Sequence, residues 1–325
     1  MKSTTDFFDV VVVGAGISGL LAAKDLQQAG KAVLVVDKGR GVGGRLATRQ
    51  MGEVAIDHGA QFMTTRNARF AELVQSWVKN EVAGEWYRSI GGAPDSHPRF
   101  RGYPTMNTVA KTLADGLTVR SATKVCSLRP TESSWSLELE DQSSISANAV
   151  VLTAPVPQTL ALAKDSSLNL DPSQQEELEA IQYERCLATM MVLAGPSAVP
   201  SPGCLVPSEG PLAWVADNQR EGLETPHGMI LHATDAFSRS RWDQDREQTA
   251  KEMMAAAEAW IATEVLSVQV HGWRYSKPIR VHEQPCLVLK GLPPAVLAGD
   301  AFAGPRVEGA AVSGWAAAEA INSAL

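Results

Sequence analysis

The feature that most constrains the fold is the stretch at residues 10–20, VVVVGAGISGL. Its valines predict a strand that is apolar on both faces, as in the middle of a parallel sheet. The GxGxxG spacing that follows is typical of a dinucleotide-binding turn: Gly14 makes the tight turn, Gly16 lets a pyrophosphate approach the backbone, and Gly19 lets the next helix pack on the strand. The helix N-terminus would receive the phosphate charge. The residues predicted to bind the dinucleotide here are Gly14, Ala15, Gly16, Ile17, Ser18 and Gly19.

A βαβ unit surrounds this turn. Apolar residues at helical spacing run from Ile17 to Ala29, and Gly30 stands where a helix C-cap belongs. The run KAVLVVDK then predicts a second strand ending at Asp37. A carboxylate at this distance from the glycines accepts the ribose hydroxyls of the adenosine half. The alternative is a tight turn without a ligand, and these residues alone fit NAD as well as FAD.

A second glycine cluster, DKGRGVGGRLATR, follows the second strand. An NAD-binding domain usually continues through further βαβ units, whereas this chain runs into the cluster and then into AIDHGAQFMT. Glycines gathered in ordered structure usually mean close backbone approach. We therefore predict that Lys38, Gly43, Gly44 and Arg45 line the cofactor, with Arg45 supplying positive charge to the pyrophosphate. A surface loop with solvated arginines is the alternative.

The middle of the chain changes in character. An apolar stripe predicts an amphipathic helix over 66–79, residues 89–104 read as a loop excursion, and a short helix should end at Gly116. Three strand-like runs within 117–152 predict a small meander that ends on an apolar strand.

A different domain is expected from about residue 156 to residue 285. This part has proline and glycine breaks, scattered tryptophans and one long helix with an apolar face at Met253, Met254, Ala257, Trp260 and Ile261. The last forty residues contain the strand-like run AVLAGD and a helix rich in glycine and alanine, so they should return to the nucleotide domain.

Charge and cysteine content exclude several classes of function. The net charge of −7 over 325 residues argues against nucleic acid or an anionic membrane as a partner. The four cysteines have no metal-binding spacing, so we predict no metal site. Asp6 and Asp9 stand where a signal peptide would be basic, and no run approaches the roughly 18 apolar residues of a membrane helix. We expect a cytoplasmic, soluble protein whose oligomeric state the sequence does not reveal.

Five segments together resemble the flavin-containing amine oxidase superfamily and, within it, the renalase-like oxidases of bacteria: VVVVGAGISGL, VVDKGRGVGGRLATR, DHGAQFMTTR, AGD and RVEGAAVSG. The resemblance implies an α/β fold, with a Rossmann-like FAD-binding domain (a parallel sheet plus a small β-meander) and an interleaved α+β substrate domain, as in amine oxidases and p-hydroxybenzoate hydroxylase. The FAD-binding domain would comprise residues 1–80, 104–155 and 286–325, and the substrate domain residues 81–103 and 156–285.

The resemblance also implies further contacts to FAD. Asp300, after Gly299, would accept a ribityl hydroxyl or support the pyrophosphate. A helix opened by the RVEGAA segment would direct its N–H groups at the flavin and stabilise the negative charge of the reduced ring. The further residues implied in FAD binding are Gln61, Phe62, Val125, Ala154, Val307, Glu308, Gly309, Ala310 and Ala311. Relatives often carry Glu where this chain has Asp37, and the shorter side chain should still reach the ribose.

The implied reaction is oxidation of the 2- and 6-dihydro isomers of NAD(P)H to NAD(P)+. The flavin would take the hydride, and O2 would be reduced to H2O2. The flat substrate ring would be contacted by residues from a set of six candidates: Trp214, Asn218, His232, Ser238, Trp273 and Tyr275. Each could instead be a core or capping residue. Arg239, Arg241 and Arg274 could contact substrate phosphates or remain solvated.

Two other functions stay open on the same scaffold. An ordinary flavin amine oxidase or a related dehydrogenase or desaturase is the first; many amine oxidases use a lysine near the flavin, and Lys277 and Lys290 lie in the corresponding region. A flavin-binding protein without turnover is the second.

Overall fold

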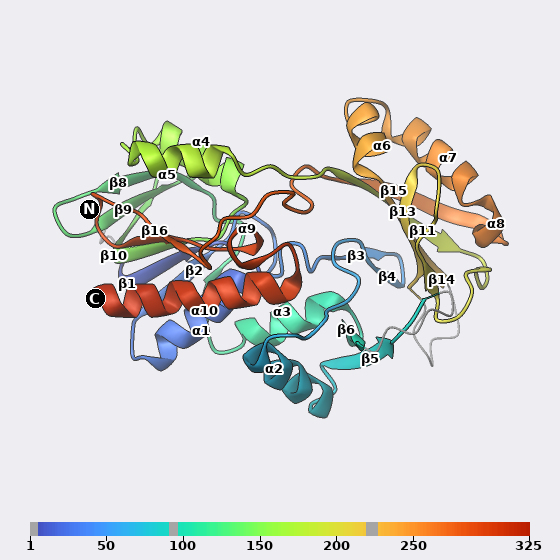
Figure 1. The fold of residues 1–325 in the computed structure, drawn as a ribbon, viewed down its shortest axis with the longest axis horizontal. Helices are drawn as coiled ribbons and strands as arrows, with labels where there is room; N and C mark the ends of the chain where they lie inside the picture. The colour runs from blue at the N-terminus through green and yellow to red at the C-terminus, as the bar shows by residue number, and fades with distance from the viewer. Residues whose placement is uncertain (1–5, 91–96, 219–226) are drawn as a thin grey trace. The chain divides into compact units, whose positions relative to one another are not determined.

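The structure is a computed structural model that describes residues 6–90, 97–218 and 227–325. The chain divides into two compact units (Figure 1). Unit 1 comprises residues 1–44, 110–182 and 278–325, and unit 2 comprises residues 45–109 and 183–277. Each is described by itself below.

Unit 1 is built on an eight-stranded sheet in the order β16-β17-β10-β1-β2-β7, with β8 and β9 extending from β10. Strands β17, β10, β1, β2 and β7 run parallel to one another, so the valine run lies in the middle of a parallel sheet, as predicted. The strands are β1 (Asp6–Val13), β2 (Val33–Val36), β7 (Thr118–Arg120), β8 (Val125–Pro130), β9 (Trp135–Leu139), β10 (Ser144–Leu152), β16 (Leu287–Val288) and β17 (Ala295–Leu297).

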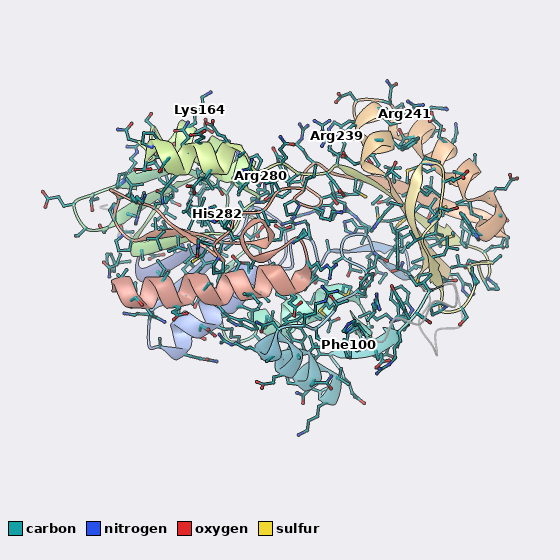
Figure 2. All side chains as sticks on the ribbon, in the orientation of Figure 1. Phe100, Lys164, Arg239, Arg241, Arg280 and His282 are labelled. Atoms are coloured by element: carbon teal, nitrogen blue, oxygen red, sulfur yellow. The ribbon has the colours of Figure 1, made fainter. Side chains whose placement is uncertain are left out.

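Helices α1 and α10 pack against each other in unit 1 (Figure 1). A Cβ at Gly314 would overlap the backbone of Ser18, so the glycine permits this close approach. The stretch that follows residue 278 is anchored too: His282 Nε2 lies 3.0 Å from a carboxylate oxygen of Glu177 (Figure 2). The helices are α1 (Ile17–Gln28), α4 (Val156–Asp165), α5 (Pro172–Glu179), α9 (Asp300–Ala303) and α10 (Val307–Ala324), while α3 (Met106–Ala114) crosses from unit 2 into unit 1.

The first of the three predicted strand runs in 117–152 is in fact two strands. β7 pairs with β2, whereas β8 joins β9 and β10 in the expected meander. The chain turns between them because Ala122, at a φ of 50°, donates its N–H to Gly39 O at 2.7 Å. The loop after β2 therefore separates the two strands, and residue periodicity cannot reveal this contact.

Unit 2 is built on a five-stranded antiparallel sheet in the order β12-β13-β14-β11-β15. Two hairpins, β3-β4 and β5-β6, complete its strands. The strands are β3 (Thr48–Met51), β4 (Val54–Asp57), β5 (Ala83–Tyr87), β6 (Arg99–Gly102), β11 (Cys186–Leu193), β12 (Cys204–Leu205), β13 (Leu212–Asp217), β14 (His227–Ala233) and β15 (Val265–Trp273). The helices are α2 (Ala68–Lys79), α6 (Asp235–Ser240), α7 (Arg246–Ala256) and α8 (Glu258–Ile261).

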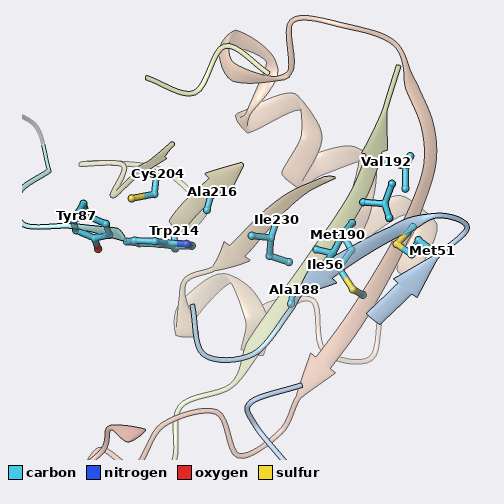
Figure 3. Packing of buried hydrophobic residues seen from close by; sticks show 11 residues of the cluster. Met51, Ile56, Tyr87, Ala188, Met190, Val192, Cys204, Trp214, Ala216 and Ile230 are labelled. Atoms are coloured by element: carbon cyan, nitrogen blue, oxygen red, sulfur yellow. The ribbon is translucent and has the colours of Figure 1, made fainter. Parts of the chain in front are cut away.

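The two faces of this sheet carry different cores, because side chains alternate along each strand. One face, with Leu187 and Leu231, packs with Trp242 and Met253 from the helical segment that follows β14. The opposite face, with Met190 and Ile230, packs against Met51 and Ile56 of the β3-β4 hairpin and against a group of aromatic rings (Figure 3). We call these the helix face and the hairpin face.

Three boundaries differ from those predicted. The long helix near residue 253 is broken at Ala257 into α7 and α8. The excursion at 89–104 contains β6, which pairs with β5, although residues 91–96 lie outside the described residues. Residues 45–80 fall in unit 2 because Val54 and Ile56 enter its core.

Residues 156–182 and 278–285 fall in unit 1, where α4 packs on β8. The boundaries of the two compact units thus differ from the boundaries of the predicted domains. The assignment of cofactor and substrate to particular domains remains a prediction. No helix among the described residues combines the length and hydrophobicity needed to cross a bilayer.

Candidate functional site

The three fingerprint glycines have different surroundings in unit 1. Gly14 has a φ of 115°, and a Cβ there would overlap Thr153 Oγ1. A Cβ on Gly19 would overlap the carbonyl oxygen of Gly14. Gly16 is the exception: no described heavy atom outside its chain neighbours lies within 4 Å of the position its Cβ would take. Gly14 and Gly19 therefore serve packing of the turn, whereas the space beside Gly16 is open to a ligand.

The N-terminus of α1 is available to an anion. Its N-cap residue is Gly16, and within the described residues no side chain caps the helix and no acidic residue lies in its first turn. The leading N–H groups of a helix have no partner within the helix and carry partial positive charge. Ser18 adds a buried Oγ without a hydrogen-bond partner among the described residues. These features fit the pyrophosphate of a dinucleotide.

The second glycine cluster lies against this turn. Gly43 N donates to Ala15 O at 2.8 Å, and a Cβ on Gly44 would lie 3.5 Å from Gly16 Cα. Close backbone approach, rather than a separate surface loop, is therefore what this cluster provides. The Lys38 ammonium donates to Gln158 Oε1 at 2.8 Å, so it reaches toward α4.

Asp37 has a role that the fingerprint did not predict. Its Oδ2 accepts a hydrogen bond from Ala15 N and its Oδ1 accepts one from Gly39 N, both at 2.6 Å. The carboxylate thus ties the fingerprint turn to the loop after β2. A ribose contact from the remaining lone pairs of Asp37 stays a prediction.

The C-terminal motif also lies in unit 1. Gly299 donates its N–H to Ser313 Oγ at 2.8 Å, and the buried Asp300 opens α9. A Cβ on Gly309 would overlap Gly304 O, so the end of the α9 segment lies against the first turn of α10. This turn carries Val307, Glu308, Gly309, Ala310 and Ala311. Val125 is buried at the start of β8, and Ala154 follows β10.

The other predicted cofactor residues, Arg45, Gln61 and Phe62, belong to unit 2. Arg45 Nη1 donates to the carbonyls of Tyr275 and Ser276 at 3.2 and 3.0 Å. Gln61 Nε2 donates to Asp57 O at 2.6 Å. Their contacts within unit 2 are therefore structural, and their contacts to FAD stay predictions.

A row of side chains crosses the hairpin face of the unit 2 sheet. Strand register places Trp214 opposite His232, His232 opposite Ala188, and Ala188 opposite His271. The small Ala188 thus stands between two histidines. Phe62 packs on Trp214 with ring centroids 5.6 Å apart.

His58, which we did not predict as a site residue, joins this row. Its carbonyl oxygen lies 3.2 Å from His232 Nε2 and accepts from Trp273 Nε1 at 2.8 Å. Its ring stacks on Trp273 at 5.3 Å and meets His271 edge-on at 4.9 Å. The motifs DHG and HGW were the available sequence signal, but only strand register brings them together. His232 and Trp273 therefore hold the backbone of the loop that continues to Gln61 and Phe62.

The histidines are neutral near pH 7. Burial, helped by the neighbouring His271 and Arg49, lowers the pKa of His58 to about 3. Burial lowers the pKa of His232 to about 4. Despite this clustering, no group of three metal-ligating side chains is arranged to hold a metal ion within the described parts of the chain. The cluster therefore offers neutral imidazole and indole rings, with the Arg49 guanidinium nearby.

Two other candidates have structural partners. Asn218 Oδ1 accepts from Asp57 N at 2.9 Å, which ties β13 to β4. Ser238 lies on α6, where its Oγ donates to Thr234 O at 2.7 Å and accepts from Leu187 N at 3.0 Å. It is fully buried toward the helix face, so unit 2 does not bring it together with Trp214, His232 and Trp273.

The predicted phosphate-binding arginines behave differently from one another. Arg239 pairs with Asp235 and Arg241 with Glu252, each at 2.8 Å; both arginines are labelled in Figure 2. Arg274 instead lies over the Trp242 ring, 5.5 Å from its centroid. Arg239 and Arg241 are thus engaged in ion pairs and are weaker candidates for binding a substrate phosphate than Arg274.

The parallel sheet with its glycine turn and open helix N-terminus defines an α/β dinucleotide-binding protein. Residues 12–77 match the NAD(P)-binding Rossmann-like domain, and residues 77–322 match the flavin containing amine oxidoreductase family. The chain belongs to this family. Its members use a flavin, typically FAD, so the protein is a flavin-dependent oxidoreductase.

Individual relatives refine this picture. Mouse (Mus musculus) renalase is 23% identical over 318 residues, covering 90% of this chain and 92% of that protein. The (S)-6-hydroxynicotine oxidase of Paenarthrobacter nicotinovorans is 51% identical over 43 residues, but the match spans only 13% of this chain and 10% of that protein. Among solved structures, a triple mutant of putrescine oxidase superposes with a TM-score of 0.77 at 15% identity, covering 98% of this chain and 99% of the other. This likeness shows the fold alone.

Proposed function

We propose that the protein is a renalase-like oxidase that converts the 2- and 6-dihydro isomers of NAD(P)H to NAD(P)+, with O2 as electron acceptor and H2O2 as product. The observation that carries the proposal is the correspondence with renalase over 318 residues, which spans both units. The matches to amine oxidases at higher identity cover only 43 to 55 residues. The bound flavin supplies the hydride acceptor and the electrons for O2.

The neutral histidines of the hairpin face fit this substrate class, with Arg49 as the cation beside them. A dihydronicotinamide ring releases a hydride with the help of its own nitrogen lone pair, so no side chain has to remove a proton. His58 and His232, whose pKa values burial depresses to about 3 and 4, place no positive charge opposite the developing pyridinium. Of the two candidate lysines for amine-oxidase chemistry, Lys277 pairs with Glu184 at 3.0 Å.

Trp214 is the residue to which we assign ring recognition. Its indole packs with Phe62 and Trp86 on the hairpin face. Its Nε1 is buried and has no hydrogen-bond acceptor among the described residues. An orphaned buried donor is costly unless a ligand satisfies it. The carboxamide oxygen of a nicotinamide is an acceptor of the required kind.

Anaerobic reduction tests the proposal. Dihydronicotinamide isomers should bleach the flavin absorbance of the purified protein within one turnover, and admitted air should yield one peroxide per substrate oxidised. Bleaching only by primary or secondary amines would show that the protein is an amine oxidase instead. Absence of bleaching by either class would indicate flavin binding without turnover.

Trp214→Phe examines the assigned residue, because it keeps an aromatic ring and removes the N–H donor. We expect KM to increase roughly 10-fold, because the loss of one hydrogen bond costs about 1.4 kcal/mol. Trp86→Phe is the matched control. Trp86 Nε1 already donates to Pro202 O at 2.9 Å, so this variant should leave KM unchanged. An unchanged KM in Trp214→Phe would remove Trp214 from substrate recognition.

A further inference from the structure

Three guanidinium groups surround one tryptophan in unit 2. The Cζ atoms of Arg185, Arg246 and Arg274 lie 4.9, 5.4 and 5.5 Å from the ring centroid of Trp242. Any two of these Cζ atoms are therefore at most roughly 11 Å apart, which is close to the Debye length in about 0.1 M salt. Their mutual repulsion is thus only partly screened.

The fold assembles this cluster from distant segments. Cys186 of β11 pairs with Trp273 of β15, so Arg185 and Arg274 flank the same end of two adjacent strands. Arg246 is the first residue of α7, which packs on β15. A Cβ on Gly272 would lie 3.1 Å from the Trp242 ring and 3.3 Å from Arg246 Nη2, so this glycine makes room for both.

Nearby carboxylates compensate the charge of the cluster only in part. Among the described residues no acidic side chain forms an ion pair with these three arginines, and Arg246 Nη1 is buried without a hydrogen-bond partner. Asp235 accepts the backbone N–H of Arg185 and interacts electrostatically with its guanidinium, but its ion pair is with Arg239. Glu184 is held by Lys277.

Asp245, beside Arg246 in the chain, is engaged as well, since its carboxylate caps α7 at Gln248 N. The contrast with Arg241, which pairs with Glu252, shows that the same region neutralises other arginines. Three guanidinium groups without an ion-pair partner among the described residues therefore surround one buried ring in a chain of net charge −7.

We propose that Arg185, Arg246 and Arg274 form an anion site for a phosphate-bearing ligand, of the size of a pyrophosphate group. Guanidinium groups present paired N–H donors that match phosphate oxygens, and the Trp242 ring holds them in place by cation–π contact. The cluster lies with the helix-face core, whereas His271 and Trp273 belong to the hairpin face. Burial lowers the pKa of His271, and the charges of Arg49 and Arg246 add to this effect. The cluster is therefore close to the aromatic surface assigned to ring recognition although it lies on the other face of the sheet, and pyrophosphate binding to it does not depend on the proposed redox substrate.

Calorimetric titration of the FAD-loaded protein with inorganic pyrophosphate tests the site. We expect binding that weakens at least 10-fold in Arg246→Gln and in Arg185→Gln, and that falls as NaCl is raised. Arg241→Gln is the matched control, because it removes an arginine of the same region that Glu252 already neutralises. Arg274→Gln is a further variant at an exposed side chain, so it tests the site even if the more buried substitutions unfold the protein.

Equal pyrophosphate affinity in the wild type and all arginine variants, or no binding by the wild type, would overturn the proposal. Activity assays then identify the source of the phosphate. A KM that rises in Arg246→Gln for dihydronicotinamide dinucleotides, but not for the phosphate-free dihydronicotinamide riboside, would assign the site to the substrate. Unchanged KM values alongside lost pyrophosphate binding would assign it to a separate phosphorylated ligand. Because pyrophosphate binding needs no turnover, its failure is distinguishable from failure of the proposed oxidase activity.

Discussion

Substitutions at Gly16 and Gly19 should separate cofactor binding from folding. Gly16 has a φ of −75° and a ψ of 175°, which any residue adopts, and no described heavy atom outside its chain neighbours lies within 4 Å of its would-be Cβ. Gly19 has no such freedom, because its Cβ would overlap Gly14 O and lie 3.1 Å from Val12 Cγ1. The two glycines belong to one motif, but Gly19 faces protein atoms whereas Gly16 faces the space open to a ligand.

The expected magnitudes follow from these surroundings. Gly16→Val should change the stability of the apoprotein by no more than about 1 kcal/mol, since the gain from a stiffer unfolded chain offsets a poorer N-cap residue. It should weaken FAD binding on the order of 100-fold, about 2.8 kcal/mol, because the side chain takes the space of the pyrophosphate. Gly19→Ala should destabilise the apoprotein by about 1–3 kcal/mol, because the Gly14 carbonyl and the first turn of α1 must move apart.

Urea unfolding of the apoproteins and fluorescence titration with FAD measure the two quantities separately. FAD at 100 times its Kd should stabilise the wild type by about 2.7 kcal/mol and leave Gly16→Val almost unaffected. Gly84→Val is the control, since Gly84 of β5 in unit 2 also has open space around its Cβ position. FAD affinity within threefold of wild type in Gly16→Val, or wild-type stability in Gly19→Ala, would refute this reading of the fingerprint.

Three further predictions concern single residues. Burial lowers the pKa of His58 to about 3 and that of His232 to about 4, so both stay neutral in the folded protein, whereas the same histidines in the unfolded chain are protonated below about pH 6.5. The stability contributed by the two histidines should therefore be complete above pH 6.5 and fall toward pH 4 by at most about 1.4 kcal/mol per pH unit for each histidine. In urea unfolding at pH 7 and pH 5, a His232→Leu variant should lose less stability between the two pH values than the wild type. Ser238→Ala leaves the buried N–H of Leu187 without its acceptor, so it should cost about 1–3 kcal/mol in unfolding experiments with KM unchanged, and a changed KM would return Ser238 to the substrate site. Asp300→Ala should lower flavin occupancy on purification, measured from the absorbance ratio of flavin to protein, and full occupancy would remove Asp300 from the cofactor site.

The cofactor end was largely readable from the sequence because its residues are close in the chain. Residues 10–37 form one βαβ unit, and the roles of its glycines follow from local backbone geometry. Even here a tertiary contact was hidden: Asp37 holds Ala15 and Gly39, which periodicity cannot show. The strand β6 was missed for a similar reason, since it is held by pairing with β5 and by the backbone bridge between Phe100 and Met63.

The sequence by itself determined the class of the protein: a dinucleotide turn, a second glycine cluster and a distant C-terminal motif that together indicate a flavoprotein. The tertiary structure decided which polar residues serve chemistry and which serve packing. It placed Ser238 away from Trp214, engaged Arg239 and Arg241 in ion pairs, and brought His58 onto Trp273. The physical reason is that strand register and burial set the partners and protonation of side chains far apart in the chain, and neither quantity is written in local residue spacing.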